Sequence, residues 1–468
     1  MRLFLIGLAN LVPEQIDVAR MLKKNHEIRY WVRITDHFKL DAAEFSGTVF
    51  HEYQGALRAR GAPGIAITDF DPWSPGQIAT YAAVESEFMS MADKVYPQWP
   101  VNQRKELYHD MLRYWGGVLE KFSPDAIIFQ SVPHQLFDFV LYEIARRRHL
   151  RTLILDSIWQ DERYQLIEDY REGSGALARS RDGDRRGSLD DLSPEMRAYY
   201  LDHKESSNPV PLSMSVFLKT HTLRHNLRRL LHVSARFIRD GTIFERAALK
   251  IVKMMKSSML DEYRAHQCPV DLAALFVYFP LHYQPELTTS PLAGVFVDQV
   301  LAIKILAAAL PDGWELYVKE HPAQMGVHGG NPTPARYRGF YKAIAEVPRV
   351  RLIPISTNTF ELCDSAKTTA TLTGTAAWES ILRGKAALVF GYPWFMHAPG
   401  ILRVESVEDC QRALHTIIEG FAPSEADISK YLHAIEHTTV KDNPQARTPG
   451  RAYDTKAMYH AIENALAS

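Results

Sequence analysis

Short apolar runs that end at small or polar residues recur along the chain, most regularly between residues 270 and 405. In this part, β-branched and aromatic runs predict strands at 271–279, 315–319, 350–354, 368–373 and 386–390. Helical periodicity between them predicts helices at 292–310, 359–365 and 376–383, and one more that ends near residue 347. Strands and helices that alternate at this pitch indicate a parallel sheet. Polar residues that follow such strands meet at one edge, where ligands bind, so we predict a nucleotide-binding domain over 270–405.

The first 170 residues show the same alternation less regularly. Strands are predicted at 3–7, 27–32, 124–130 and 151–156, and helices at 13–24, within 75–121 and after residue 134. This order is typical of a Rossmann-like half-domain, but Gly7 does not open the glycine-rich turn that binds a dinucleotide phosphate. We therefore predict that 1–170 forms a domain for the acceptor or for scaffolding.

The composition changes between these two domains. Residues 173–207 are rich in Arg, Asp, Ser and Gly, which predicts a mobile surface insertion. Residues 217–256 hold ten Lys or Arg and two acidic residues, a net charge of +8 (10 − 2), with apolar residues at helical spacing. We predict a polar and helical insertion over 171–269. Helices over 406–468 are expected to return to the first domain.

The basic segment at 217–256 has two interpretations of equal weight. A basic amphipathic helix pair can lie on an anionic membrane surface. This interpretation predicts a peripheral protein at the inner face of the membrane. The alternative is a pair of solvated helices that pack on the N-terminal domain.

The bulk composition fits a globular, water-soluble protein. The 468 residues suffice for two α/β domains of about 200 residues each. Hydrophobic residues make up 46% and charged residues 23% of the chain. The net charge of −1 provides no global field for nucleic acid, and we expect no nucleic-acid partner. The three cysteines lack metal-binding spacing, and no apolar run suits a signal peptide or a spanning helix, so we expect a cytoplasmic protein.

The sequence TGTAAWE at 373–379 joins a predicted strand to a predicted helix. Gly374 permits close approach of a ligand to the backbone, while Thr373 and Thr375 place hydroxyls beside the free amides of a helix N-terminus. That combination suits a nucleotide phosphate. Glu379 lies one turn later, on the face of Thr375, where its carboxylate can accept hydrogen bonds from ribose hydroxyls. The structural alternative is an ordinary helix N-cap.

Two further strand ends carry candidate residues. Pro322 restricts His321 to an extended backbone, which aims the imidazole outward as a donor to a phosphate, and Lys319 adds a positive charge nearby. In the N-terminal half, Gln130 and His134 follow a predicted strand and are expected to face the crevice from the acceptor side. The alternative for His134 is a local packing role.

Several of these stretches resemble the capsule polysaccharide biosynthesis family. They are FPLHYQPE at 279–286, YVKEHP at 317–322, TGTAAWE at 373–379, the Gly-Lys pair at 384–385 and, in the N-terminal half, FQSVPH at 129–134. The family includes the capsule-linker β-Kdo transferases, which act on lipid acceptors. The resemblance implies a GT-B-like α/β architecture: two Rossmann-like domains face a cleft, and the C-terminal one holds most of the sugar nucleotide.

The resemblance also implies a reaction, a donor and roles for site residues. It implies a glycosyltransferase of capsular or other surface polysaccharide biosynthesis, with a nucleotide-sugar donor such as CMP-Kdo and a lipid-linked or saccharide acceptor. His321 and residues 373–375 would bind the donor phosphate, Glu379 the nucleoside, and Gln284 belongs to the donor loop. Because Glu286 is the only carboxylate on that loop, we predict Glu286 and His321 as catalytic residues. No Asp-x-Asp pair lies near the site, and no metal or other cofactor is implied.

Two other functions stay open. A polyol-phosphate transferase, of the kind that builds teichoic acids, uses a related two-domain architecture and would need two histidines beside the phosphate, a role that His282 and His321 can fill. A catalytically inactive protein that scaffolds capsule enzymes is the third hypothesis. The sequence leaves the donor sugar, the acceptor and the stereochemistry of transfer undetermined.

Overall fold

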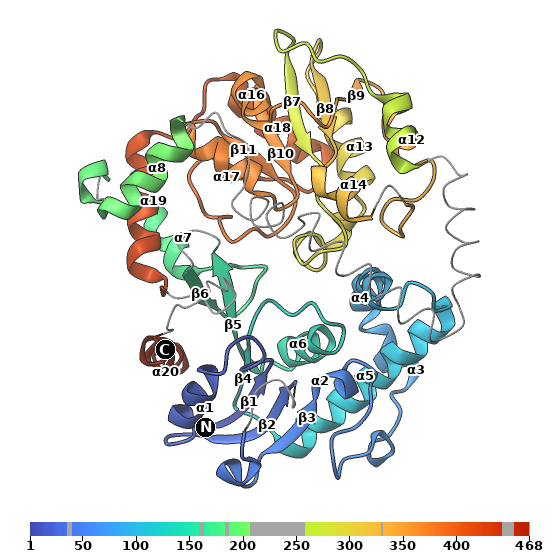
Figure 1. Ribbon diagram of the computed structural model, residues 1–468, viewed down its shortest axis with the longest axis vertical. Helices are drawn as coiled ribbons and strands as arrows, with labels where there is room; N and C mark the ends of the chain where they lie inside the picture. Colours follow the sequence, from blue (N-terminus) through green and yellow to red (C-terminus); the bar gives the residue numbers. More distant parts are fainter. Residues whose placement is uncertain are drawn as a thin grey trace, which may run out of the picture.

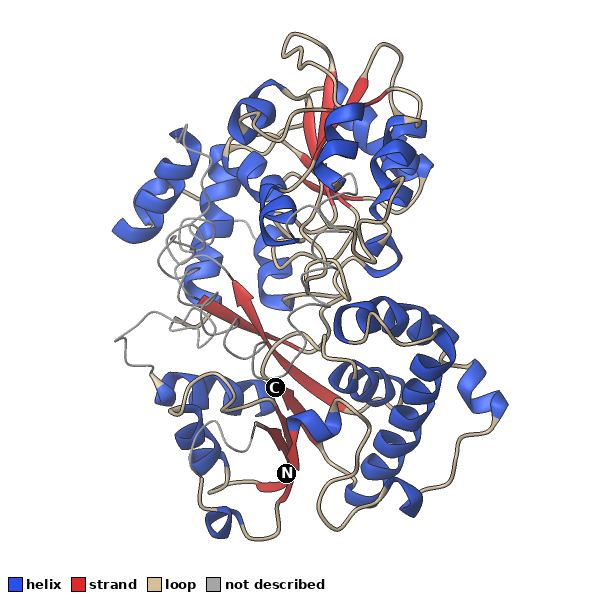
Figure 2. Cartoon of the chain, turned by 45° about the vertical axis from the view of Figure 1, so that its right-hand side comes forward, coloured by secondary structure: helices blue, strands red, loops and turns tan. Residues whose placement is uncertain are grey.

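The computed structural model describes residues 1–34, 40–158, 163–182, 187–205, 258–328, 331–441 and 454–467. Two six-stranded sheets form the centres of two α/β domains, the N-terminal one at the bottom of Figure 1 and the C-terminal one at the top. Helices surround the strands of both sheets (Figure 2).

The N-terminal sheet has the strand order β3-β2-β1-β4-β5-β6. Its strands are β1 (Arg2–Ile6), β2 (Glu27–Arg33), β3 (Val49–Glu52), β4 (Ala126–Phe129), β5 (Arg151–Ile158) and β6 (Arg163–Ile167). The domain's helices are α1 (Gln15–Leu22), α2 (Tyr53–Ala56), α3 (Pro75–Ala79), α4 (Ala82–Val95), α5 (Val101–Phe122) and α6 (Phe137–Arg147). Neighbouring strands are parallel except β6, which runs antiparallel to β5.

The C-terminal sheet has the order β12-β11-β10-β7-β8-β9, and all its pairs are parallel. Its strands are β7 (Phe276–Pro280), β8 (Glu315–Lys319), β9 (Val350–Leu352), β10 (Thr368–Thr371), β11 (Ala387–Val389) and β12 (Ile401–Arg403). Its helices are α12 (Met259–His266), α13 (Gln299–Ala309), α14 (Pro322–His328), α15 (Phe340–Ala345), α16 (Thr359–Ser365), α17 (Thr375–Leu382) and α18 (Val407–Ile418).

Both sheets follow one topology. When the strands are numbered within each domain, each sheet has the order 3-2-1-4-5-6, which is the order of a Rossmann fold. The prediction of two Rossmann-like domains is confirmed. In each sheet the order reverses between the first and fourth strands, so the ligand sites of such folds lie beyond the ends of β1 and β4, and of β7 and β10.

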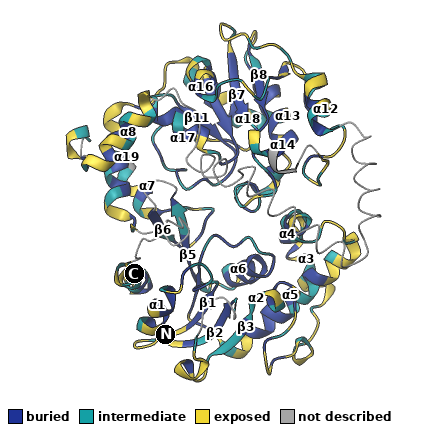
Figure 3. Ribbon diagram, viewed as in Figure 1, coloured by how far each residue is buried: buried dark blue, intermediate teal, exposed yellow. Residues whose placement is uncertain are grey.

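Both faces of each sheet are covered, as the alternation of side chains along a strand requires. In β1, Leu3 and Leu5 enter one apolar cluster and Phe4 and Ile6 enter another. In β7, Val277 and Phe279 face one cluster, and Phe276 and Tyr278 face the other. The central strands are accordingly buried (Figure 3). Because the interiors of these strands are apolar, the polar side chains of the site lie at the ends of the strands.

The described part of the segment predicted as a mobile surface insertion, 173–207, folds into helices. This segment contains α7 (Gly175–Asp182) and α8 (Pro194–Glu205). Its apolar side chains join a cluster with α17 and α19 (Glu425–Thr438); they are Leu177, Leu192, Met196 and Tyr200. The composition suggested disorder because polar residues dominate, although these four side chains supply enough burial to dock the helices. The basic segment at 217–256 lies outside the described residues.

The C-terminal helix α20 (Thr455–Ala467) packs on the N-terminal domain. Met458, Ile462 and Leu466 join the cluster that contains Leu3 and Leu5 of β1. The chain therefore ends against the domain with which it begins (Figure 1). Among the described helices, none is long and apolar enough to cross a membrane.

Candidate functional site

His282 lies at the switch point of the C-terminal sheet, just beyond β7. Its Nε2 is 2.9 Å from the Thr371 hydroxyl oxygen at the end of β10, and it accepts the Thr373 backbone N–H at 3.3 Å. Burial lowers the pKa of His282 to about 3, so the ring is neutral at pH 7. Because Nε2 accepts, the ring proton is on Nδ1, and that N–H is the group the imidazole can offer to a ligand.

Gly374 is the residue that lets β10 approach this imidazole. A Cβ at position 374 would lie 2.8 Å from the Thr371 hydroxyl oxygen and 3.3 Å from the His282 ring. The Gly374 amide donates to the Thr371 hydroxyl at 3.2 Å. Glycine is therefore required here by space, and the close approach of a ligand to this backbone stays a prediction.

The start of α17 has two amide groups that no side chain caps. Gly374 is the N-cap residue of α17 and supplies no side-chain acceptor. The Thr373 amide is used by His282, and the Thr373 hydroxyl donates to the Thr288 carbonyl at 2.6 Å. The Thr375 hydroxyl hydrogen-bonds the Glu379 carboxylate. The amides of Thr375 and Ala376 remain as donors for the anion expected over 373–375, and Thr373 joins the loops after β7 and β10.

His321 is the second neutral imidazole of the site. Its Nδ1 accepts the Ala323 backbone N–H at 3.2 Å, so the ring proton is on Nε2. Burial lowers the pKa of His321 below its ordinary value. The charge of Glu320 acts in the opposite direction but has a smaller effect. The pKa of His282 is lowered further by its electrostatic interaction with His321, so the two rings lie within electrostatic range. Each ring has one N–H to donate.

Lys319 and Glu379 form a second polar group beside the strand ends. The Lys319 ammonium donates to the Thr357 carbonyl at 2.8 Å and to the Thr359 hydroxyl at 2.7 Å. Burial lowers the pKa of Lys319 to about 8 and raises that of Glu379 to about 7. The charge of Lys319 lowers the pKa of Glu379, and the charge of Glu379 raises the pKa of Lys319. The two predicted donor residues therefore interact electrostatically.

Glu286 lies where the C-terminal domain meets the N-terminal one. Its neighbours on the loop, Leu287 and Leu292, pack against the apolar core of the N-terminal domain. Burial by surrounding atoms raises the pKa of Glu286, and the charge of Lys94 on α4 opposes that shift. Lys94 is a site residue that the sequence analysis missed, because it lies on a helix of the other domain.

His134 contributes to the same boundary from the N-terminal side. Its Nδ1–H donates to the Val132 carbonyl at 2.7 Å, which leaves Nε2 as an acceptor. Burial lowers the pKa of His134 to about 4 and raises that of Asp138 to about 7, and the charge of Lys94 acts on both groups. The charge of Lys94 therefore acts on groups of both domains, His134 and Glu286.

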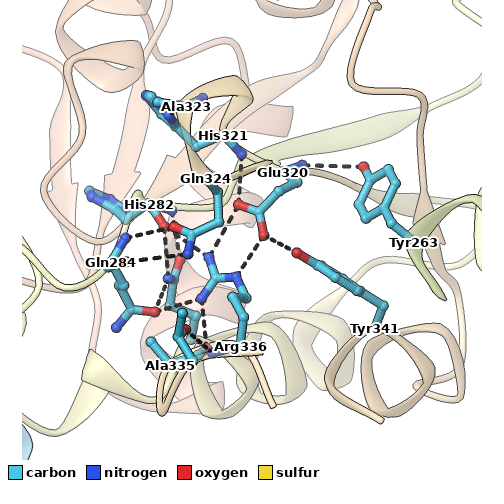
Figure 4. A network of polar contacts seen from close by, with 12 residues as sticks. Tyr263, His282, Gln284, Glu320, His321, Ala323, Gln324, Ala335, Arg336 and Tyr341 are labelled. Atoms are coloured by element: carbon cyan, nitrogen blue, oxygen red, sulfur yellow. Dashed lines mark hydrogen bonds and ion pairs between the residues drawn. The ribbon is translucent and has the colours of Figure 1, made fainter. Parts of the chain in front are cut away.

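The other two predicted residues are held inside the protein. Gln130 accepts a 2.6 Å hydrogen bond from the Gln15 side chain, beside the turn after β1. Gln284 accepts from the side chain of Arg336 (Figure 4). It also accepts from the Gln299 side chain and donates to the Val297 carbonyl at 2.9 Å. Donor binding by Gln284 stays a prediction. No group of three or more potential metal ligands occurs within the described ranges.

Residues 294–435 match the family model described as "Capsule polysaccharide biosynthesis protein". The predicted family resemblance is confirmed. The matched region, residues 294–435, contains β8 to β12, His321, Gly374 and Glu379. It begins after the loop that carries His282 and Glu286, and it ends in α19. A search of curated proteins finds no match.

Solved structures with related folds include glycosyltransferases and epimerases. The β-Kdo 2,4-transferase of KpsC from Thermosulfurimonas dismutans shares 13% identity over 72% of this chain and 87% of its own, with a TM-score of 0.32. The KpsC β-Kdo 2,7-transferase of that organism shares 9% identity over 84% and 97%, with a TM-score of 0.29. The UDP-GlcNAc 2-epimerase of Methanocaldococcus jannaschii shares 12% identity over 93% and 99%, with a TM-score of 0.24. The fold assignment rests on the topology of the two sheets.

Proposed function

We propose that the protein is a glycosyltransferase of capsular or other surface polysaccharide biosynthesis. The donor is a sugar activated by a nucleotide, which binds at the switch point of the C-terminal sheet. The observation that carries this proposal is the pair of neutral imidazoles, His282 and His321. Each has one N–H to donate, His282 lies against the uncapped start of α17, and the matched region includes His321 and α17.

The donor phosphate is the group these N–H donors suit. His282 Nδ1–H, His321 Nε2–H and the amides of Thr375 and Ala376 are fixed by the hydrogen bonds that their other atoms make. As the glycosidic bond to the phosphate breaks, negative charge develops on the leaving oxygen. Donors that are already oriented stabilise that charge without reorganisation, which is the largest contribution available to such an enzyme. Glu379, beside Thr375 on α17, is assigned to the nucleoside.

Glu286 is the carboxylate we assign to the reacting sugar. It lies at the domain boundary, where a donor held by the C-terminal domain meets an acceptor held by the N-terminal one. A raised pKa brings a carboxyl group closer to neutral pH, which suits a general base. The positive charge of Lys94 favours the ionised form of the Glu286 carboxyl group, and His134 faces this boundary from the acceptor side.

The assay that tests the proposal compares CMP-, CDP-, UDP- and GDP-activated donors with the full chain. We expect release of free nucleotide from one of them when a saccharide or lipid-linked acceptor is added, and loss of that release in His321→Ala. The absence of turnover with every donor, combined with normal folding, would contradict the enzyme proposal and favour an inactive assembly protein.

A polyol-phosphate transferase is the second candidate, and the observation that favours it is again the histidine pair. Such an enzyme attacks phosphorus, so both imidazoles would flank the transferred phosphate. The fate of the donor phosphate distinguishes the two reactions. A CDP-polyol donor would release CMP and leave a phosphate on the acceptor. A CMP-activated sugar would also release CMP but leave no phosphate on the acceptor, and a UDP- or GDP-activated sugar would release the diphosphate.

Attachment to an anionic membrane is proposed from the sequence of 217–256 alone. Each Lys or Arg near an anionic surface contributes about 1 kcal/mol within a Debye length. Flotation with anionic liposomes tests this: binding should fade at high salt and vanish when Arg228, Arg229, Arg236 and Arg239 are replaced by glutamine. If the wild type ignores anionic liposomes at low salt, the segment is not a membrane anchor.

A further inference from the structure

A buried ion pair lies beside the loops that follow β7 and β8. Arg336 Nε lies 2.6 Å from Glu320 Oε2, and the two side chains are 1% and 0% exposed. The Tyr341 hydroxyl donates to the same carboxylate oxygen at 2.6 Å. The His321 amide donates to the other oxygen at 2.7 Å, and an Arg336 terminal nitrogen does so at 3.2 Å. Each carboxylate oxygen therefore has two donors, as a buried charge requires.

All five N–H groups of the Arg336 guanidinium have acceptors. Besides the two bonds to Glu320, its terminal nitrogens donate to the His282 carbonyl at 2.9 Å, the Gln284 side-chain oxygen at 2.7 Å and the Ala335 carbonyl at 3.0 Å. Figure 4 shows the guanidinium between the loop of His282 and Gln284 and the strand end of Glu320 and His321. One side chain therefore ties together the two loops that carry the site's histidines.

The loop after β7 depends on side chains for its backbone hydrogen bonds. Gln299 accepts from the His282 amide at 2.8 Å and donates to the His282 carbonyl at 3.2 Å. Gln324 pairs in the same way with the amide and carbonyl of Gln284, at 2.9 and 3.2 Å. The position of this loop is therefore set by Gln299, Gln324 and Arg336, in place of a neighbouring strand.

We propose that Arg336 is a positioning residue of the donor site, which fixes the distance between the His282 and His321 imidazoles without touching the ligand. The inference rests on the proposed function in so far as those imidazoles bind the donor. At 1% exposure the guanidinium has no access to a substrate, so it acts only through the groups it holds. Nothing near Arg336 in the sequence marks this role, since it lies 16 residues from Glu320 in a Gly- and Pro-rich stretch.

A lysine cannot replace this arginine. An ammonium keeps the positive charge, but it has three donors around one point and lacks the planar fork that reaches Glu320, His282 and Gln284 at once. Arg336→Lys should therefore keep the charge balance and loosen the two loops relative to each other. We expect the affinity for the nucleotide to fall by about tenfold, because neither histidine is then held in place.

The control is Arg163→Lys, at a buried arginine remote from the site. Arg163 donates to the Thr439 hydroxyl at 2.6 Å and to backbone carbonyls of α19 and the residue after it. The substitution removes a comparable fork and lowers the melting temperature without disturbing the donor loops. Its nucleotide affinity should stay within about twofold of the wild type. Tyr341→Phe is the milder second variant at the site, for use if Arg336→Lys does not fold.

Two measurements on the full chain test the proposal. Calorimetry with CMP, CDP, UDP and GDP gives the affinity, and hydrogen–deuterium exchange over residues 281–290 and 320–325 reports the loops without any nucleotide. Faster exchange in both loops of Arg336→Lys, with weaker binding, supports the proposal. Unchanged exchange there, or wild-type affinity despite a lower melting temperature, would overturn it. If the wild type binds no nucleotide, the proposed function fails, and loop exchange alone decides the positioning role.

Discussion

The imidazole of His282 and the hydroxyl of Thr371 join the ends of β7 and β10, with 2.9 Å between His282 Nε2 and Thr371 Oγ1. This contact spans the point where the strand order of the C-terminal sheet reverses. The Thr373 backbone N–H donates to the same Nε2, which places the ring proton of His282 on Nδ1. The geometry of the proposed phosphate site therefore depends on how closely β10 can approach the imidazole.

Gly374→Ala should break this contact. The added Cβ would lie 2.8 Å from the Thr371 hydroxyl oxygen and 3.3 Å from the His282 ring, so the ring or the strand end must move. We expect nucleotide affinity to fall by about tenfold or more, the scale of a lost hydrogen bond to a charged group. Gly76→Ala is the control, because a Cβ at Gly76 on α3 meets no atom within 4 Å. Equal nucleotide binding by both variants would contradict the role of Gly374.

His321→Ala should weaken nucleotide binding by about 1.5–3 kcal/mol, the range for a charge-assisted hydrogen bond. The fold should stay intact, since among the described residues this ring makes one hydrogen bond, from the Ala323 amide. Calorimetry measures the affinity, with His415→Ala on the exposed face of α18 as the control. If His321→Ala unfolds, or binds nucleotide normally, the phosphate assignment is wrong.

The strands and helices that carry the site could be predicted from the sequence, whereas residues that act on it from elsewhere in the chain could not. β8 and α16 coincide with the predicted ranges 315–319 and 359–365, because apolar periodicity reports the burial of a strand or helix directly. The strands β3, β6 and β12 were missed. Lys94 and Arg336 were missed because their roles depend on partners distant in the sequence, which no local pattern records.

Glu286→Gln should leave nucleotide affinity unchanged and reduce turnover by about a hundredfold or more. The amide keeps the shape of the carboxyl group but can neither accept a proton nor attack the sugar. Single-turnover kinetics beside calorimetry separates the two effects, and Glu361→Gln on α16 serves as an exposed control. Wild-type turnover in Glu286→Gln would move the catalytic role to another residue.

The charge of Lys94 provides a pH test of the same assignment. Lys94 opposes the raised pKa of Glu286, so Lys94→Met should raise that pKa further. If Glu286 acts in its ionised form, the acidic limb of the pH–rate profile should move to higher pH in this variant. An unchanged limb would show that Glu286 does not govern it.

Glu379→Gln should stabilise the protein more at pH 8 than at pH 5. Burial raises the pKa of Glu379 to about 7 in the folded state, above its ordinary value. As the pH rises from 5 to 8, the Glu379 carboxyl group loses its proton at a lower pH in the unfolded chain than in the folded protein. The free energy of unfolding of the wild type therefore falls over this range. Glutamine does not ionise, and its advantage in melting temperature should grow across this range. A difference that is the same at both pH values would contradict the raised pKa.

Calorimetric titration of the full chain with CMP, CDP, UDP and GDP tests the central claim, that the switch point of the C-terminal sheet binds a nucleotide-activated donor. At least one nucleotide should bind with one site per chain, and that binding should weaken by about tenfold or more in both His321→Ala and Gly374→Ala. Binding of none of the four by the folded wild type, or equal binding by the wild type and both variants, would contradict the account.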